Sequence, residues 1–309
     1  AQYDLLVIGS VPAGQKAAVQ AAKLGKTVGI IERKTVVGGV STNTGTIPSK
    51  ALREAVLYLS GLRQRALYGA DYRLKETVTI EDLAFRANHV IKNEIEIIQN
   101  QMARNRINLI FGEARFVDPH RLLVQQAGTS TEHDAHVIVI AVGTVPTRPA
   151  DVPFDGHTII DSDGLIALKH LPKSMVIVGG GVIGTEYASI LSTIGVQVVL
   201  IDKRPRLLEF VDAQIIDTLQ RQMKDIGVTL CHDEEVVAIG KEPDGQVTVS
   251  LTHRPPITTS TLMYAIGRIG ATKHLNLEAV GLTPDARGRI VVNEHFQTTV
   301  PHIYAVGDV

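Results

Sequence analysis

The first segments of the chain alternate between strand-like and helix-like patterns. An apolar run covers Tyr3 to Ile8 and ends in a glycine-rich turn, and a second β-type run, Thr27 to Ile31, is closed by Glu32. Between these two runs, small and apolar residues recur at helical spacing: Ala17, Ala18, Ala21, Ala22 and Leu24. Strand, turn, helix, strand and acidic residue together predict one βαβ unit.

The same pattern returns in the second half of the chain. Met175 to Val178 is typical of a strand, Gly179 to Gly184 of a turn, Thr185 to Ile194 of a helix, and Gln197 to Ile201 of a strand closed by Asp202. Strands alternate with helices throughout, which is typical of parallel sheets. The two units therefore predict an α/β fold with two Rossmann-like domains.

Three further segments complete the pattern. A helix is predicted from Ile80 to Asn105, and a buried strand from Val137 to Ala141 closes on Gly143. The proline-rich stretch Pro146 to Pro153 is typical of a loop at a domain boundary. Another strand-like segment, Val228 to Cys231, is expected to bury its cysteine as a small apolar residue.

Composition narrows the class of protein. The 309 residues suffice for about two domains, and 44% apolar with 20% charged residues is ordinary for a globular protein. A net charge of −1 gives no footprint for nucleic acid or an anionic membrane, and no apolar run approaches the roughly 20 residues of a membrane span. The single cysteine, Cys231, excludes a disulfide within the chain, so we expect a cytoplasmic location.

The second glycine turn carries a complete dinucleotide pattern. Gly179, Gly181 and Gly184 follow a strand and open a helix, and Asp202 lies 18 residues after Gly184. The glycines allow a tight turn, close approach to a pyrophosphate and helix–strand packing, while the helix N-terminus offers free N–H groups. Asp202 is expected to accept hydrogen bonds from a ribose.

The first turn has the same spacing with one departure. Gly9 and Gly14 are followed by Glu32, again 18 residues after the last glycine, but the central position is Val11. A valine where backbone approaches a pyrophosphate is expected to cost roughly 1–3 kcal/mol, by analogy with overpacking. That is about 5- to 150-fold in affinity. The first site is therefore either functional but weakened, or empty.

A motif between the turns carries a family resemblance. Residues 38–50 read GGVSTNTGTIPSK, which resembles the active-site helix of the flavoprotein pyridine nucleotide–disulfide oxidoreductases, written there G-G-x-C-x4-C-I-P-S-K. The run from Asn43 to Val56 resembles the soluble FAD-dependent NAD(P)+ transhydrogenases, which carry threonine at the second redox position, as Thr46 does here. Further matching segments follow in family order: Val142–Gly143 with Pro146, 181–189, 265–268 and 304–308.

The resemblance implies a domain order and partners. Residues 1–150 correspond to the first part of an FAD-binding domain, 151–273 to an inserted NAD(P)-binding domain, and 274–309 to a return segment of the first. The family's C-terminal dimerisation domain is missing, so we interpret the chain as truncated or as a degenerate member. Homodimers are expected of full-length members, not of this chain alone. The expected ligands are FAD, NAD and NADP, with no nucleic-acid, membrane or metal partner.

The resemblance also implies roles for particular residues. Lys50 is expected to meet Glu186 next to the reacting nitrogen of the flavin, and Asp308 to contact the ribityl chain. Lys203 and Arg204, which follow Asp202, are expected to hold a 2′-phosphate and so permit dual coenzyme use. Further cofactor contacts are assigned to Arg33, Gly38, Gly39, Ser41, Gly45, Thr46, Gly143 and Gly267.

Residue chemistry selects among the reactions of such a family. Ser41 and Thr46 carry no thiols, so disulfide reduction is excluded and hydride transfer between nicotinamide and flavin remains. Val11, Ser41 and Val142 depart from the family pattern. Two alternatives to a transhydrogenase stay open: a non-catalytic nucleotide-binding relative, and a diaphorase that passes electrons to quinone or oxygen. The sequence leaves the electron acceptor and the coenzyme preference open.

Overall fold

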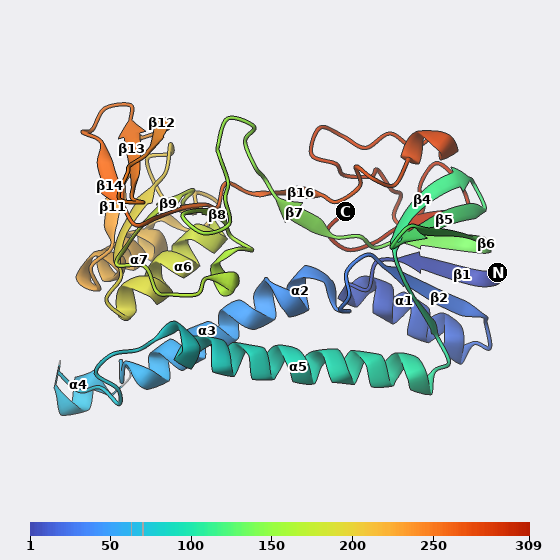
Figure 1. Ribbon diagram of the computed structural model, residues 1–309, viewed down its shortest axis with the longest axis horizontal. Coiled ribbons are helices and arrows are strands. Elements are labelled where there is room, and N and C mark those ends of the chain that lie inside the picture. Colours follow the sequence, from blue (N-terminus) through green and yellow to red (C-terminus); the bar gives the residue numbers. More distant parts are fainter. Residues whose placement is uncertain (63, 70) are drawn as a thin grey trace. The chain divides into compact units, whose positions relative to one another are not determined.

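The computed structural model describes residues 1–62, 64–69 and 71–309 (Figure 1). Contacts divide the chain into two compact units. The first unit comprises Ala1–Ile47, His89–Val145 and Arg268–Val309, and the second comprises Pro48–Asn88 and Pro146–Gly267. The second unit is thus inserted into the first along the chain, and each contains a parallel sheet. The fold class predicted from the sequence is confirmed.

The first unit is built on a seven-stranded sheet. Its parallel strands are β3 (Asn108–Phe111), β2 (Val28–Glu32), β1 (Gln2–Ile8), β6 (Thr129–Ile140) and β17 (Ile303–Ala305). Two antiparallel strands, β5 (Arg121–Gln126) and β4 (Glu113–Asp118), extend the sheet beyond β6. In register, Leu6 of β1 lies between Gly29 of β2 and Ile138 of β6.

Helices cover the sheet of the first unit on one face. Helix α1 (Pro12–Lys23) lies against β1 and β2 (Figure 1). It buries Ala18 and Val19 in a core cluster with Val7, and Ile98 from the long helix α5 (Ile80–Arg104) joins them. Burial of these apolar side chains is the main force holding helix to sheet.

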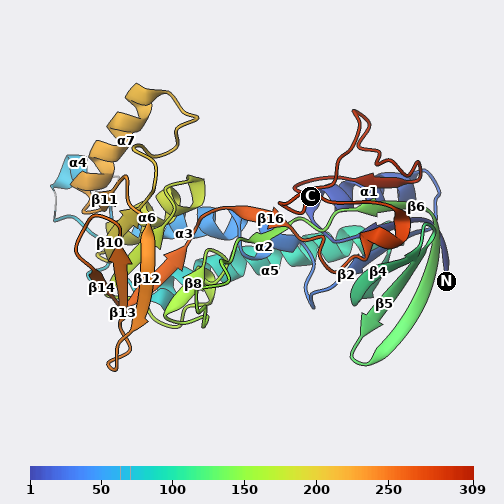
Figure 2. The ribbon, with the colours of Figure 1, turned by 90° about the horizontal axis from the view of Figure 1, so that it is seen from above.

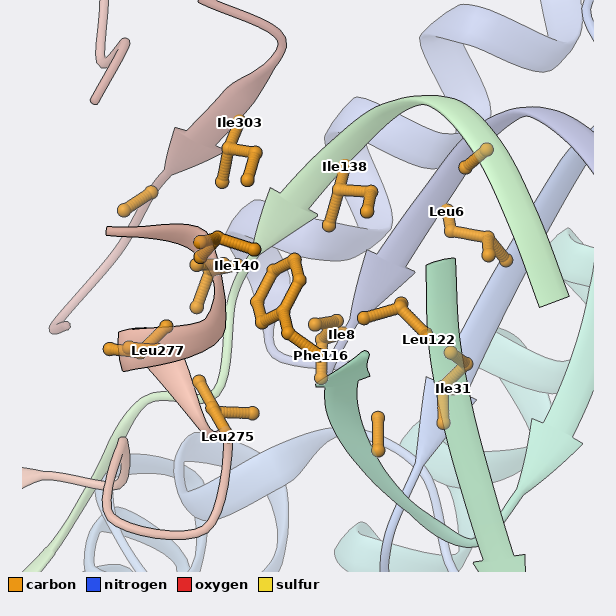
Figure 3. Close-up of a cluster of buried hydrophobic side chains, with 14 of the residues drawn as sticks. Leu6, Ile8, Ile31, Phe116, Leu122, Ile138, Ile140, Leu275, Leu277 and Ile303 are labelled. Atoms are coloured by element: carbon orange, nitrogen blue, oxygen red, sulfur yellow. The ribbon is translucent and has the colours of Figure 1, made fainter. Parts of the chain in front are cut away.

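The other face of that sheet has its own core. Phe116 and Leu122 of the antiparallel strands pack with Ile138 and Ile140 of β6, and Leu277 closes the cluster from the 3₁₀ helix η2 (Leu277–Val280) (Figure 3). Both faces of β6 are therefore covered, as expected for a central parallel strand.

The second unit repeats the parallel arrangement. Its five-stranded sheet has the order β11 (Thr229–Cys231), β10 (Gln197–Ile201), β9 (Ser174–Val178), β15 (Thr261–Tyr264) and β8 (Ile159–Asp161). Helices α6 (Val182–Thr193) and α7 (Ala213–Asp225) follow β9 and β10. A separate antiparallel sheet consists of β12 (Val236–Lys241), β13 (Val247–Leu251) and β14 (Ile257–Thr259) (Figure 2). It shares a core cluster with the five-stranded sheet, in which Val247, Val249 and Leu251 of β13 take part. The remaining elements are α2 (Gly39–Asn43), α3 (Thr46–Leu59), α4 (Arg65–Tyr68), β7 (Thr144–Pro146), η1 (Leu165–Ala167) and β16 (Arg268–Gly270).

Two details of the sequence interpretation need correction. Strands do not alternate with helices throughout, because β4–β5–β6 and β12–β13–β14 are antiparallel. Short hairpin connections such as the one between Asp118 and Arg121 join antiparallel strands, whereas parallel strands need long crossovers. The motif at residues 38–50 forms two helices, α2 and α3, rather than one.

Other expectations have mixed outcomes. Cys231 is buried at the end of β11, as predicted. The domain limits at 150/151 and 273/274 stay predictions, since the contact-based division follows other boundaries and groups Pro48–Asn88 with the second unit. Within the described residues, no helix is long and apolar enough to cross a membrane.

Candidate nucleotide sites

The first turn joins β1 to α1. Gly9 has φ +98°, and its N–H donates to the carbonyl of Ile31 at 2.8 Å. A Cβ on Gly14 would lie 2.6 Å from the Gly9 oxygen and 2.9 Å from Val7 Cγ1. The left-handed conformation at Gly9 and the close approach at Gly14 therefore explain both glycines.

Val11 is the N-cap of α1, with φ −66° and ψ 162°, a conformation open to any L-residue. Its Cγ1 methyl lies against Gly39, where an added Cβ would overlap it, and 3.3 Å from the position of a Cβ on Gly143. Its Cγ2 methyl points towards Gly307, 4.0 Å from the equivalent position there. The side chain thus fills the space bordered by three glycines from separate loops.

Glu32 is buried and binds the turn itself. Its Oε2 accepts from the N–H of Ser10 at 3.1 Å and from the Ser10 hydroxyl, and its Oε1 accepts from the N–H of Lys34 at 3.0 Å. The Ser10 hydroxyl accepts in turn from the N–H of Gly38 at 2.8 Å. Sequence reasoning missed Ser10, although a small polar residue beside the first glycine was the available signal.

The remaining residues predicted for the first site have varied surroundings. Arg33 and Asp308 are exposed. The hydroxyls of Ser41, which was predicted, and of Thr44, which was not, are buried without a hydrogen-bond partner among the described residues, and a polar ligand could satisfy both. Gly45, in the break between α2 and α3, donates its N–H to the carbonyl of Val40 at 2.7 Å.

The second turn joins β9 to α6 in the same way. Gly179 has φ +111° and donates to the carbonyl of Ile201 at 2.8 Å, and a Cβ on Gly184 would overlap the Gly179 oxygen. Gly181 is the N-cap of α6, with φ −77° and ψ −172°. Among the described residues, no atom lies within 4 Å of a Cβ placed on Gly181, so the space above this turn is open there. The free N–H groups of the α6 N-terminus favour an anionic ligand there.

Asp202 is buried and saturated with donors. Oδ1 accepts from the N–H of Arg204 and from its Nε, both at 2.8 Å, and Oδ2 accepts from Arg204 Nη2 at 2.7 Å and from the N–H of Gly180. Burial by itself raises the pKa of the Asp202 carboxyl, but these hydrogen bonds outweigh it and hold that pKa below its ordinary value. The side-chain hydrogen bonds between Arg204 and Asp202 also raise the pKa of Arg204. Lys203 is exposed, as is Gly267 at φ +120°.

The structure brings Lys50 and Glu186 together within the second unit. Lys50 Nζ, from α3, lies 2.5 Å from Glu186 Oε1, from α6, and donates to the Ser49 hydroxyl at 3.3 Å. The Lys50 side chain is 57% exposed and that of Glu186 20% exposed. The Glu186 carboxylate thus holds the Lys50 ammonium in place, while more than half of the Lys50 side chain is exposed to solvent. The catalytic role of the pair stays a prediction.

A family model described as pyridine nucleotide-disulphide oxidoreductase matches residues 3–309. The chain belongs to this family. Among curated relatives, a soluble pyridine nucleotide transhydrogenase of Mycobacterium bovis is 50% identical over the whole chain.

Two solved structures have folds similar to that of this chain. The HOCl-induced flavoprotein disulfide reductase RclA from Escherichia coli, as a Cu(II) complex, has a TM-score of 0.88 at 29% identity, with all of this chain and 66% of that chain covered. LpdA from Mycobacterium tuberculosis has a TM-score of 0.89 at 25% identity, over 98% of this chain and 67% of that one. This family member spans 66% of the length of the M. bovis transhydrogenase.

Proposed function

We propose that this chain carries the two nucleotide sites of an FAD-dependent NAD(P)+ transhydrogenase, with FAD at the first turn and NAD(H) or NADP(H) at the second. The observation that carries the proposal is an ion pair beside a motif whose two redox positions hold no cysteine. Lys50 and Glu186 form a close ion pair, whereas Ser41 and Thr46 occupy the redox positions of the disulfide reductases. FAD, when bound, supplies the hydride-accepting and hydride-donating chemistry that no side chain possesses.

The first turn fits a dinucleotide in all respects but one. The helix N-terminus, the tight turn at Gly9 and the unpartnered hydroxyls of Ser41 and Thr44 favour a polar, phosphate-bearing ligand. Glu32 is proposed to reach the adenosine ribose through Oε1, which has a single hydrogen-bond donor among the described residues. Val11 is the exception, because its side chain occupies the space above the turn.

The second turn supports coenzyme binding without that obstacle. The open space at Gly181 suits a pyrophosphate, and the Asp202–Arg204 pair offers an acceptor for ribose hydroxyls and a donor for a 2′-phosphate. A transhydrogenase must use both coenzymes at this site. The Arg204 guanidinium is proposed to leave Asp202 when a 2′-phosphate is bound and to be displaced by ribose hydroxyls otherwise.

Lys50 is proposed to supply a fixed positive charge near the reacting ring. Glu186 holds Nζ in place, so the favourable field is organised before the substrate arrives. Because a surface ion pair contributes about 0–1 kcal/mol to stability, the pair is better explained by chemistry than by folding.

Transfer of hydride from NADPH to thio-NAD+ in the presence of FAD tests the proposal. We expect Lys50→Gln to lower the rate at least tenfold while FAD and coenzyme affinities stay within about twofold. The matched control is Arg53→Gln, which removes a cation from the same exposed face of α3, where it pairs with Glu54 at 3.0 Å. An equal loss of rate in both variants, or no transfer by FAD-loaded protein, would reject the proposal.

A second candidate, a diaphorase, is favoured by the 57% exposure of the Lys50 side chain, which leaves room for a non-nucleotide acceptor. It predicts NADPH oxidation by quinones that is faster than transfer to thio-NAD+. A non-catalytic relative is favoured by Val11 and predicts neither reaction. Small-molecule nucleotides remain the proposed partners and the cytoplasm the proposed location, with a homodimer proposed for longer relatives only.

A further inference from the structure

The side chain of Val11 holds three loops of the first unit together. The loops are those of Gly39, Gly143 and Gly307, and the Cγ1 methyl lies between the first two. Val11 also packs against the core cluster that contains Val7 and Ala141. The Val11 side chain is therefore packed against the rest of the first unit in the ligand-free chain.

The backbone at Val11 does not explain why glycine is usual there. Its φ of −66° and ψ of 162° match the extended conformation of Gly181, the equivalent N-cap in the second turn. At Gly181 an added Cβ would meet no atom of the described residues within 4 Å, whereas at Val11 the same volume is filled by methyl groups that contact glycines. The difference between the turns is thus one of occupied volume and not of backbone strain.

We propose that Val11 is an internal occupant of the first site: its side chain fills, in the ligand-free chain, the volume that a nucleotide pyrophosphate takes. This inference rests on the proposed function, because it takes FAD as the ligand of the first turn. The valine stabilises the empty site by bridging its loops and weakens FAD binding by the same contacts. FAD and the valine side chain compete for one space, so FAD binds only when the loops at Gly39 and Gly143 separate.

The competition has a chemical signature. Ligands with a pyrophosphate, such as FAD and ADP, meet the valine, whereas adenosine carries no phosphate and reaches only the Glu32 side of the site. Removal of the side chain is therefore expected to favour phosphate-bearing ligands selectively. A general loosening of the unit would change all three ligands alike.

The test compares Val11→Gly and Val11→Ala with the unaltered chain. FAD affinity is measured by fluorescence titration, ADP and adenosine by displacement of FAD, and the stability of the ligand-free chain by its Tm. We expect Val11→Gly to bind FAD and ADP about tenfold more tightly, with adenosine unchanged and the free-chain Tm lower by about 2–4 °C. Val11→Ala separates the lost volume from the added backbone freedom of glycine and is expected to gain FAD affinity as well.

The control is Val19→Ala, a buried position of α1 in the same core cluster. It is expected to lower the Tm without changing FAD affinity. Equal FAD affinity in Val11→Gly and the unaltered chain, with hydride transfer intact, would overturn the internal-occupant proposal alone. Absence of FAD binding in every variant would overturn the proposed function and this inference together.

Discussion

The two glycine turns have nearly the same backbone and different contents. Gly9 and Gly179 adopt φ of +98° and +111°, and each donates its N–H at 2.8 Å to the carbonyl of the isoleucine just before the acidic residue. The N-caps that follow, Val11 and Gly181, are both extended. Only the space above them differs, since the first is filled by a side chain and the second is open.

The difference separates what folding requires from what a ligand requires. The first and last glycines of each turn are demanded by the fold, because positive φ and close carbonyl contacts exclude a Cβ. The central glycine is demanded by neither backbone nor packing, as Val11 shows. At Gly181 the proposed role of the glycine is to leave room for a ligand.

The largest effect is expected at the last glycine of the second turn. In Gly184→Ala the added Cβ overlaps the Gly179 backbone oxygen, which a strand-to-helix turn cannot move freely. We expect a loss of about 3 kcal/mol in the free energy of unfolding, measured with urea.

Two companion variants sharpen this result. Gly14→Ala, the equivalent in the first turn, is expected to lose a similar free energy. The control is Gly240→Ala in β12, where the nearest neighbour of an added Cβ is 3.8 Å away, and we expect it to change stability by less than about 1 kcal/mol. A Gly184→Ala chain as stable as this control would show that the fold does not require the last glycine.

The second prediction transfers the valine between turns. Gly181→Val is expected to leave the fold intact, because an added Cβ meets no described atom within 4 Å, and to weaken NADH binding by about 5- to 150-fold. Titration with NADH measures the affinity and the Tm of the ligand-free chain checks the fold. Unchanged NADH affinity would remove the second turn from the coenzyme site.

The smallest effect concerns coenzyme choice. Arg204→Gln removes a bidentate donor from Asp202, so we expect NADPH to bind about three- to tenfold more weakly while NADH affinity stays equal or rises. Parallel titrations with both coenzymes measure the ratio. Equal weakening of both would mean that Arg204 only supports the loop.

The same variant has a pH signature. The pKa of Asp202 is lowered in the folded chain, so its contribution to stability is present above its ordinary pKa of about 3.9 and is lost as pH falls through the lower, folded value. Without Arg204 the folded pKa rises towards the unfolded value, so urea midpoints measured between pH 7 and 3 should fall less than in the unaltered chain. Superimposable profiles would contradict the account of Asp202.

Much of this arrangement is predictable because its signals are local. Turn glycines and the acidic residue that closes each second strand follow from motifs with fixed spacing. The Lys50–Glu186 pair, whose members lie far apart in the chain, was expected only from the resemblance to the family. What Val11 touches is not predictable in that way, because Gly39, Gly143 and Gly307 meet it only through the tertiary fold.

Other features were missed for the same reason. The pattern of apolar and polar residues in β12–β14 does not reveal which strands pair with each other. Strand pairing depends on the register between segments that are separate in the sequence. That Arg204 folds back onto Asp202 depends on side-chain rotamers, and no spacing rule reports it. The sequence therefore predicts which residues lie at a site better than it predicts which side chains already contact one another there.

The most direct test of the account adds NADPH anaerobically to the FAD-loaded chain and follows the visible absorbance of the flavin. If the two turns hold flavin and coenzyme of one hydride-transfer pathway, the absorbance is lost on addition of NADPH and returns on addition of NAD+. In Gly181→Val, which keeps its first turn unchanged, the same loss should require about 5- to 150-fold more NADPH. Flavin that stays oxidised while a titration shows NADPH bound would contradict the account.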